Sequence, residues 1–535
     1  ASENLMTMRF SPLARAIAGA TLLFSSAAQA QLAQNLTIGN PKAMAMGNAI
    51  TADYSGIDAV HYNPAALTKL KGRKTTMKFI TGVMDIRAEF DAPADYGSKF
   101  LGVKNDPVAN SSSRTTTPAV YLPGLGGATE LPLLFMPLAG LSINPPGSKL
   151  TFATNVYTPQ ALGFTREDDD PAAYQGKEVV MQRLTYFSPS LGYQMNDQLA
   201  IGLSVNFSHQ ALALNQDFRA PNLLTGFTKV AQDALCTVQG NPFEVLINIC
   251  GGEFGPFTNL ANLDVDMQQS LSPTWNLGVL WEPTDWFAWG AVYQSEAKMH
   301  MQGKYTVDYS ENWQGFWKGL DSSLFGAVFN SITPDGTVDE ERGNVSMDLT
   351  YPQHFATGIK LKPASQWQFN FDVKWTDYAA WENFELKFDR ELDMLKIARV
   401  FSPQSATATS IILDRGYESV WSWALGMQYD VNERLSLRAG YEPRPSAIPG
   451  NKADALVPLG DADLYGLGVG YRWDQDTVID LGFNYLVSKQ SIPAGTSCNV
   501  NCSGIDSVVY NPYSDLNVET TVKAYVMALT YTTSF

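Results

Sequence analysis

The stretch Trp367-Gln-Phe-Asn-Phe-Asp-Val-Lys-Trp375 decides the fold class, because every odd position is large and apolar and every even position is polar. Such a period of two predicts a β-strand with one apolar face. The same alternation returns at 421–430, 465–473 and 479–485. The polar face is rich in glycine and the apolar face in Trp and Tyr. That combination is unusual in a soluble sandwich and typical of a membrane β-barrel, which carries aromatics at both lipid interfaces.

Composition narrows the alternatives. The chain has 535 residues and a net charge of −16, and 17% of its residues are charged, against roughly 25% in an average soluble protein. No run after residue 30 approaches about 18 consecutive apolar residues, so a helical membrane protein is excluded. The acidic balance argues against a nucleic-acid partner. A large secreted globule of several domains remains the alternative to one barrel.

The segments between the alternating stretches differ strongly in length. An outer-membrane barrel has short turns on its periplasmic side and long loops outside the cell. The sequence therefore predicts short periplasmic turns at 195–198, 282–285, 362–365, 430–433 and 474–476, and long extracellular loops at 208–270, 303–347, 383–418, 443–462 and 488–518.

Both ends of the chain indicate export to a Gram-negative outer membrane. Arg9 and Arg15 flank the start of a short apolar run, and Ala28-Gln29-Ala30 fits a cleavage site, so residues 1–30 are interpreted as a signal peptide with its upstream residues. The mature chain would then begin at Gln31. The last strand ends at Phe535, and a terminal aromatic residue resembles the signal read by the outer-membrane insertion machinery.

The four cysteines fall into two local pairs, Cys236 with Cys250 and Cys498 with Cys502. In an exported protein such pairs are expected to form disulfides, here within predicted outer loops. No histidine lies near either pair, so a metal site is not expected. The sequence also lacks a nucleotide motif and a Gly-x-Ser-x-Gly motif. It therefore predicts no catalytic residue, no metal and no cofactor.

Residues 31–73 interrupt the strand pattern. They contain the small-residue run Ala43-Met-Ala-Met-Gly-Asn-Ala-Ile50 and, further on, an Asn-Pro pair. A plain N-terminal tail with one turn would explain the pair, but small residues with Met and Ile suit helices packed inside an enclosure. We therefore expect a plug, or hatch, at 31–73 inside a barrel of residues 74–535. The expected hatch motif is Tyr62, Asn63, Pro64 and Ala65.

The motifs also resemble those of a known family. The runs Ala45-Met-Gly-Asn-Ala49 and Ala59-Val-His-Tyr-Asn-Pro-Ala65 look like the hatch of the long-chain fatty acid outer-membrane transporter family, which also includes aromatic-hydrocarbon channels. Weaker motifs follow in the family's order at 188–193, 290–295 and 437–441. The resemblance implies an all-β transmembrane antiparallel barrel of fourteen strands with an N-terminal helical hatch in its lumen.

Two predicted outer loops contain helical patterns with an apolar face. The two helices could simply pack on each other, although packing and ligand capture can coexist. An apolar groove would gain roughly 0.8 kcal/mol per ligand methylene that it buries. The resemblance implies a weak capture site between such loops. The predicted groove residues are Leu223, Phe227, Val230, Trp313, Phe316, Trp317, Leu320 and Leu324.

The segment 151–163 begins as a strand and then becomes irregular. Pro159 lacks the N–H that a ladder needs, and Gly163 weakens pairing, so an ordinary strand end would explain both residues. The resemblance implies instead a kinked strand that opens a side window to the membrane. The predicted lateral opening comprises Asn155, Val156, Tyr157, Pro159, Leu162 and Gly163.

The ligand is less well defined by the sequence. The resemblance implies basic residues inside the barrel near a ligand carboxylate, but the matching stretch 207–218 has no Lys or Arg. Arg438 and Arg472 occupy polar-face positions and are the possible lumen cations, although a lumen arginine can equally belong to an internal salt-bridge network.

We therefore predict a passive transporter, not an enzyme, that takes up long-chain fatty acids. An aromatic or aliphatic hydrocarbon channel is the alternative within the class, and a structural or adhesive barrel is the alternative outside it. The expected partners are the hydrophobic ligand, outer-membrane lipid and lipopolysaccharide, and the barrel is expected to be a monomer.

Overall fold

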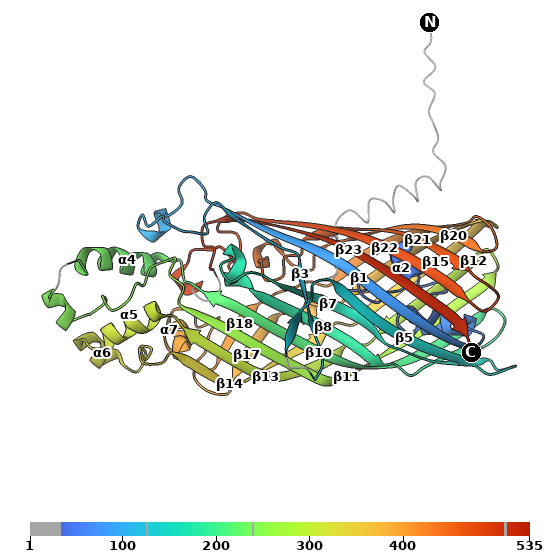
Figure 1. The fold of residues 1–535 in the computed structure, drawn as a ribbon, viewed down its shortest axis with the longest axis horizontal. Helices are drawn as coiled ribbons and strands as arrows, with labels where there is room; N and C mark the ends of the chain where they lie inside the picture. The colour runs from blue at the N-terminus through green and yellow to red at the C-terminus, as the bar shows by residue number, and fades with distance from the viewer. Residues whose placement is uncertain (1–33, 125–126, 238–239, 508–510) are drawn as a thin grey trace, which may run out of the picture.

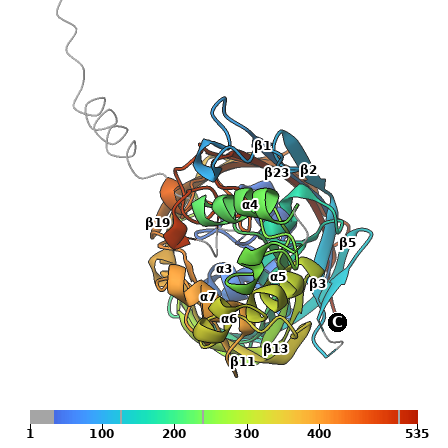
Figure 2. The ribbon, with the colours of Figure 1, turned by 90° about the vertical axis from the view of Figure 1, so that its left-hand side faces the viewer.

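The computed structural model describes residues 34–124, 127–237, 240–507 and 511–535. The predicted signal peptide, residues 1–30, and the predicted mature start at Gln31 lie outside these residues. The described chain forms a closed antiparallel barrel of 14 strands, seen from the side in Figure 1 and from its loop-bearing end in Figure 2. Pairing of β1 (Gly72–Asp91) with β23 (Asn517–Ser534) closes the barrel. The predicted fold class is confirmed.

Half of the barrel strands are continuous and half are interrupted into two segments. The continuous strands are β1, β10 (Leu199–Phe218), β11 (Ala261–Thr284), β20 (Leu435–Arg444), β21 (Asp461–Arg472), β22 (Val478–Ile492) and β23. The interrupted strands are β2 (Ser111–Thr115) with β5 (Leu134–Asn144), β6 (Leu150–Asn155) with β7 (Tyr157–Thr165), β8 (Glu178–Phe187) with β9 (Ser190–Gln194), β12 (Phe287–Gln294) with β13 (Ala297–Tyr309), β14 (Glu340–Tyr351) with β15 (His354–Ala364), β16 (Trp367–Thr376) with β17 (Asn383–Phe388), and β18 (Ser410–Asp414) with β19 (Val420–Asp430).

Strand β11 inverts its alternation half way along its length. In its lower part, Trp275 and Trp281 face outward and are exposed, as expected for a wall in lipid. The register between β10 and β11 shifts at a bulge. Above it Val265 and Met267 are buried in the lumen, while Asp264 is exposed. The upper wall therefore has a polar outer face and an apolar inner face, as in a soluble protein.

This inversion corrects the expected bounds of the long loops. Strand β10 continues to Phe218 and β11 begins at Ala261, inside the segment predicted as loop 208–270. Likewise β13 and β14 extend into the predicted loop 303–347. These strand halves carry polar residues on the outside and apolar residues on the inside. That pattern is not the one of a lipid-facing strand, so the sequence predicts loops there.

The plug, residues 34–70, lies inside the barrel (Figure 2). It contains the short helices α2 (Pro41–Ala45), η1 (Gly56–Asp58), α3 (Ala59–Tyr62) and η2 (Pro64–Lys69). Asn40 caps α2 by accepting from Ala43 N at 2.7 Å, and Pro41 occupies the first helical position. Asn63 and Pro64 start η2 in the same way, which explains the Asn-Pro pair.

A belt of glycines on the inner wall seats the plug. A Cβ at Gly440 would overlap the backbone of Met46 and Gly47, and one at Gly202 would overlap Pro64 and Ala65. Any larger residue at these positions would therefore have to displace the plug backbone. The glycine belt consists of Gly202, Gly290, Gly426, Gly440, Gly466 and Gly482, from six different strands.

A short hairpin interrupts the second barrel strand between β2 and β5. Its strands β3 (Thr117–Tyr121) and β4 (Ala128–Glu130) lie in front of β7 and β8 in Figure 1. Tyr121 N donates to Gln182 Oε1 at 3.2 Å, and Gln182 Nε2 donates to Tyr121 O at 2.9 Å. The hairpin packs on Val180 and Ala213, whose side chains point away from the lumen. It therefore covers the outer face of the upper wall.

Helical loops crown the end of the barrel that lies opposite the C-terminus (Figure 1). They contain α4 (Leu223–Leu235), α5 (Glu311–Asp321), α6 (Leu324–Phe329) and α7 (Asp393–Phe401). Both predicted disulfides, Cys236–Cys250 and Cys498–Cys502, are formed and lie in this crown. Among the helices of the described residues, none combines the length and the hydropathy needed to cross a membrane.

Candidate ligand site and its exits

Above the plug the lumen contains an apolar slot, which we call the lumen cavity. It has about 60 Å³ of free space, so a long ligand must displace side chains to enter. Two of the lining residues, Met181 and Met347, are flexible enough to repack at small cost. The lining side chains include Leu162, Met181, Leu212, Met347, Trp381 and Leu456.

Arg183 stands at the end of this cavity nearer the plug. It lies opposite Gln160, which lines the cavity, in the register between β7 and β8. The guanidinium is 1% exposed, donates to Ser272 Oγ at 3.0 Å and Ser272 O at 2.8 Å, and lies 4.3 Å from the Tyr351 ring centroid. Its neighbour Gln210 is buried with no partner for either side-chain polar atom within the described chain.

Arg183 differs from two other buried arginines in having no carboxylate among its described contacts. Arg219 pairs with Asp106 at 2.6 Å, and Arg415 pairs with Asp454 at 2.5 Å. A buried cation is costly unless an anion compensates it. Arg183 and Gln210 together are therefore suited to receive an anionic group that enters the lumen.

The wall beside the cavity is incomplete. Strand β6 pairs with β5 only from Ile143 to Gly140, and one further bond joins Val156 N to Ala139 O. Beyond that point, the edge of β5 from Leu134 to Leu138 has no strand partner on this side within the described chain, and β7 resumes with a register shift after Tyr157. We call this gap between β5 and β7 the window.

The N-terminal segment occupies the free edge of β7 at the window. Gln34 forms an antiparallel bridge with Gln160, and Asn35 N donates to Pro159 O at 3.0 Å. Thr37 Oγ1 donates to Thr158 O at 3.1 Å. The plug thus pairs the carbonyls of Thr158 and Pro159 on the β7 side of the window, while the β5 edge keeps no strand partner within the described chain.

The predicted opening residues lie around this window. Asn155 ends β6, Val156 forms the break, and Tyr157 is buried against the His61 ring at a centroid distance of 5.1 Å. Pro159 supplies the carbonyl for Asn35. Leu162 lines the lumen cavity, whereas Gly163 lies against Ala119 of the outer hairpin.

Asp58 joins the plug to the kink and to the wall. One carboxylate oxygen accepts from Lys78 Nζ at 2.6 Å and from Asn155 Nδ2 at 2.7 Å, and the other accepts from Asn40 Nδ2 at 3.0 Å. Asp58 is 1% exposed and Lys78 is fully buried. Asn155 is the last residue before the kink, so the plug and the window share one buried ion pair.

The hatch motif makes further contacts with the wall. Asn63 Nδ2 donates to Thr51 O at 2.7 Å and to Val279 O at 3.0 Å, so one side chain links two parts of the plug to β11. Tyr62 Oη donates to Asn48 Oδ1 at 3.3 Å. Ala65 is fully buried beside the glycine belt.

Below the plug the lumen opens into a polar vestibule of about 790 Å³. Both predicted lumen cations line it, so they lie on the far side of the plug from the lumen cavity. Arg438 donates to Asp480 at 2.5 Å, and Arg472 is exposed. Acidic and basic side chains alternate around the vestibule, which makes it a poor path for an alkyl chain.

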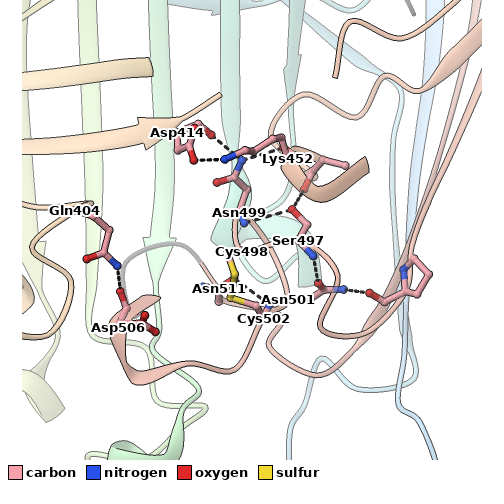
Figure 3. Close-up of a disulfide and its surroundings, with 12 residues drawn as sticks. Gln404, Asp414, Lys452, Ser497, Cys498, Asn499, Asn501, Cys502, Asp506 and Asn511 are labelled. Atoms are coloured by element: carbon pink, nitrogen blue, oxygen red, sulfur yellow. Dashed lines mark hydrogen bonds and ion pairs between the residues drawn. A yellow bond between two sulfur atoms is a disulfide. The ribbon is translucent and has the colours of Figure 1, made fainter. Parts of the chain in front are cut away.

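Loops meet around the Cys498–Cys502 disulfide at the crown end of the barrel (Figure 3). Within the Cys498–Cys502 ring, Asn499 Nδ2 donates to Asp414 O at 2.7 Å and Lys452 O at 2.9 Å. Ser497 Oγ donates to Ala453 O at 2.6 Å. The disulfide ring therefore ties three loops together above the lumen cavity.

The predicted capture residues divide into two sets. Trp313, Phe316, Trp317 and Leu320 are 3–6% exposed and form a packed interior with Phe254. Leu223, Phe227, Val230 and Leu324 are 43–61% exposed. Val245 of η5 (Pro242–Val245) and Val328 of α6 are also exposed, so α4, η5 and α6 each carry apolar side chains that face solvent.

Sequence reasoning missed Arg183 and Gln210 because the outer hairpin covers β8 and β10. Val179, Val180 and Met181 are consecutive apolar residues, since both faces of β8 are buried. The sequence pattern therefore does not show whether the Arg183 side chain faces the lumen. The signal that was available is that Arg183 is the single charged residue between Val179 and Phe187.

The geometry defines a class: a plugged outer-membrane barrel with an apolar lumen site. The family model for "Outer membrane protein transport protein (OMPP1/FadL/TodX)" matches residues 19–535. The chain belongs to this family of outer membrane transport proteins, and the predicted family and location are confirmed.

Several known proteins are similar. Outer membrane protein P1 of Haemophilus influenzae is 22% identical over 87% of both chains. The "Long-chain fatty acid transport protein" of Escherichia coli is 24% identical over 40% of this chain and 41% of its own length. Among solved structures, a Pseudomonas aeruginosa FadL homologue has a TM-score of 0.65 at 18% identity, covering 94% of this chain and 100% of that one. The Pseudomonas putida toluene transporter TodX has a TM-score of 0.58 at 15% identity, covering 94% and 99%.

Proposed function

We propose that this protein carries long-chain fatty acids passively across the outer membrane. The observation that supports a fatty acid over a hydrocarbon is Arg183, a buried lumen cation with no carboxylate among its described contacts. A fatty acid would place its tail in the lumen cavity, gaining roughly 0.8 kcal/mol per buried methylene. Its carboxylate would lie at Arg183 and Gln210.

Capture would begin at the exposed apolar surface of the crown. Phe227, Val230 and Leu324 project from α4 and α6 into solvent. Contiguous exposed apolar surface commonly marks a binding site. The buried aromatic interior of α5 would hold these helices in place rather than touch the ligand.

Release would be lateral, through the window. The charged vestibule below the plug opposes passage of an alkyl chain toward the periplasm. The window needs only the withdrawal of residues 34–37 from β7, since these residues supply the pairing that closes it. Outer-membrane lipid beside the window, in the leaflet that also contains lipopolysaccharide, would receive the ligand. This route needs only one barrel, so the protein would act as a monomer.

Replacing Arg183 with methionine tests the ligand class. Hydrogen bonds to charged groups contribute about 1.5–3 kcal/mol, so oleate affinity should fall roughly ten-fold or more. Affinity for a neutral alkane of equal length should not fall. Equilibrium binding of both labelled ligands to purified protein in one non-ionic detergent measures the two effects.

The matched control is Arg342→Met, which removes an exposed arginine from the outer wall. It should leave both affinities unchanged. A wild-type protein that prefers the alkane, or an Arg183→Met protein that binds oleate as before, would favour the hydrocarbon-channel alternative. That alternative is supported by the apolar lining of the lumen cavity and by the similarity in fold to the Pseudomonas putida toluene transporter.

Straightening the kinked strand tests lateral release. Changing Thr158-Pro159 to Val-Thr restores an N–H at position 159 and favours pairing of β7 with β5. Uptake of labelled oleate by cells should then be lost, while oleate binding to the purified protein should persist. Pro273→Val, a strand proline of β11 away from the window, is the control. Normal uptake by the straightened variant would contradict release through the window.

A further inference from the structure

A second buried arginine stands at the other end of the lumen cavity. Strands β7 and β8 face the lumen with Gln160 and Arg183 in one row, Leu162 and Met181 in the next, and Phe164 and Val179 above them. Arg166 follows directly after the end of β7, two residues beyond Phe164, and its backbone N donates to Lys177 O at 2.7 Å. The two apolar rows, Leu162 with Met181 and Phe164 with Val179, thus lie between two arginines.

Arg166 has unused hydrogen-bond donors. The side chain is 9% exposed, donates from Nη1 to Gly176 O at 2.5 Å and lies 4.6 Å from the Phe164 ring centroid. Its Nε and Nη2 have no partner within the described chain. A Cβ added at Gly176 would lie 3.7 Å from both Arg166 Nη1 and Leu456 Cδ1, so the guanidinium is close to a side chain that lines the cavity.

The nearby carboxylates are engaged elsewhere. Asp168 and Asp217 lie 3.6 and 3.4 Å from Lys177 Nζ. Asp170 accepts from Ala172 N at 2.7 Å as the cap of η4 (Pro171–Gln175), and its charge acts on Arg166 without a direct ion pair. Asp106 pairs with Arg219. Nε and Nη2 of Arg166 thus remain available to donate to a ligand group.

The spacing of the two arginines matches a long alkyl chain. Gln160 and Arg166 are six residues apart on one strand, which at a rise of about 3.3 Å per residue gives roughly 20 Å. An extended alkyl chain advances about 1.25 Å per carbon, because it is a zigzag of C–C bonds of about 1.5 Å. A chain of about sixteen carbons therefore matches the backbone length from Gln160, which lies opposite Arg183, to Arg166.

We propose that Arg166 is a second carboxylate site, and that the lumen cavity takes linear α,ω-dicarboxylates of about sixteen carbons with one carboxylate at each arginine. This inference rests on the proposed fatty-acid function, because it uses Arg183 for the other carboxylate. A monocarboxylate would fill only one of the two sites.

The test compares binding of three ligands to the purified full chain in one detergent: palmitate, hexadecanedioate and decanedioate. The wild type should bind hexadecanedioate roughly ten-fold more tightly than palmitate, and decanedioate more weakly than either because it cannot span the cavity. Arg166→Met should remove the preference for hexadecanedioate and leave palmitate affinity unchanged. Arg342→Met, the outer-wall control, should change none of these values.

Two results would overturn the proposal: equal affinities of the wild type for palmitate and hexadecanedioate, or a preference for hexadecanedioate that persists in Arg166→Met. A wrong fatty-acid function would give a different result from a wrong second site. In that case the affinity for palmitate would not change in Arg183→Met. Arg166→Lys keeps the charge, so it should retain part of the preference if the guanidinium binds the carboxylate. If Arg166→Met loses palmitate binding as well, Arg166 has a structural role instead and the proposal fails.

Discussion

Gly440→Val should force the plug from its seat and leave the barrel open. The added side chain would overlap the backbone of Met46 and Gly47, which lie on the inner wall at β20. Overpacking of this kind costs typically about 1–3 kcal/mol, and the upper value would shift the closed-to-open equilibrium by roughly a hundred-fold. Cells that carry the variant should become permeable to a large hydrophilic antibiotic that the wild type excludes.

Gly450→Val is the matched control, because a Cβ at Gly450 meets no neighbouring atom and the residue lies in an outer loop. It should leave permeability at the wild-type level. Insertion of Gly440→Val into the outer membrane must be verified by surface labelling. An inserted Gly440→Val barrel that stays impermeable would show that the plug can shift within the lumen without opening it.

Asp58→Asn should release the plug by a different route. The substitution keeps the size of the side chain but leaves Lys78 as a buried charge without its counter-ion. Breaking one partner of a buried ion pair costs about 3–5 kcal/mol. Hydrogen exchange of backbone amides in residues 40–70 should therefore accelerate by at least about a hundred-fold, and exchange at β22 and β23 should stay slow.

The double variant Asp58→Asn/Lys78→Met separates charge from shape. It removes the unpaired ammonium, so exchange in the plug should return most of the way to the wild-type rate. Lys360→Met is a control, since Lys360 lies 3.9 Å from the plug residue Asp53 at the edge of the vestibule and Asp53 keeps its 2.8 Å pair with Lys42. If the double variant exchanges as fast as Asp58→Asn, the hydrogen bonds that the carboxylate accepts from Asn40 and Asn155, rather than the ion pair, hold the plug.

The membrane half of the fold could be predicted from the sequence because lipid imposes a strict alternation. Trp367 to Trp375 forms β16 as the pattern requires, with polar side chains such as Asp372 turned inward to the plug. The two disulfides followed from export and local spacing. The Asn63-Pro64 pair starts a short helix by a local rule of capping, so a turn at this pair could be predicted from the sequence.

The remaining features depend on contacts between distant parts of the chain. Nothing local in residues 117–130 indicates a hairpin outside the wall, and its cover over Val180 and Ala213 removes the alternation of β8 and β10. No local feature of the sequence separates Arg183 and Arg166 from an arginine that pairs with a carboxylate, such as Arg219. The predicted cations Arg438 and Arg472 share the correct face but lie below the plug, a position that alternation alone does not specify.

The inverted upper wall implies that the two halves of the barrel respond differently to temperature. Residues such as Val265 and Met267 leave water when the upper half folds, whereas Trp275 and Trp281 exchange one apolar surrounding for another. Burial from water carries a large heat-capacity change, about 12–15 cal/mol/K per residue in globular domains. The upper half should therefore have a curved stability profile and weaken on cooling, while the lower half remains closed.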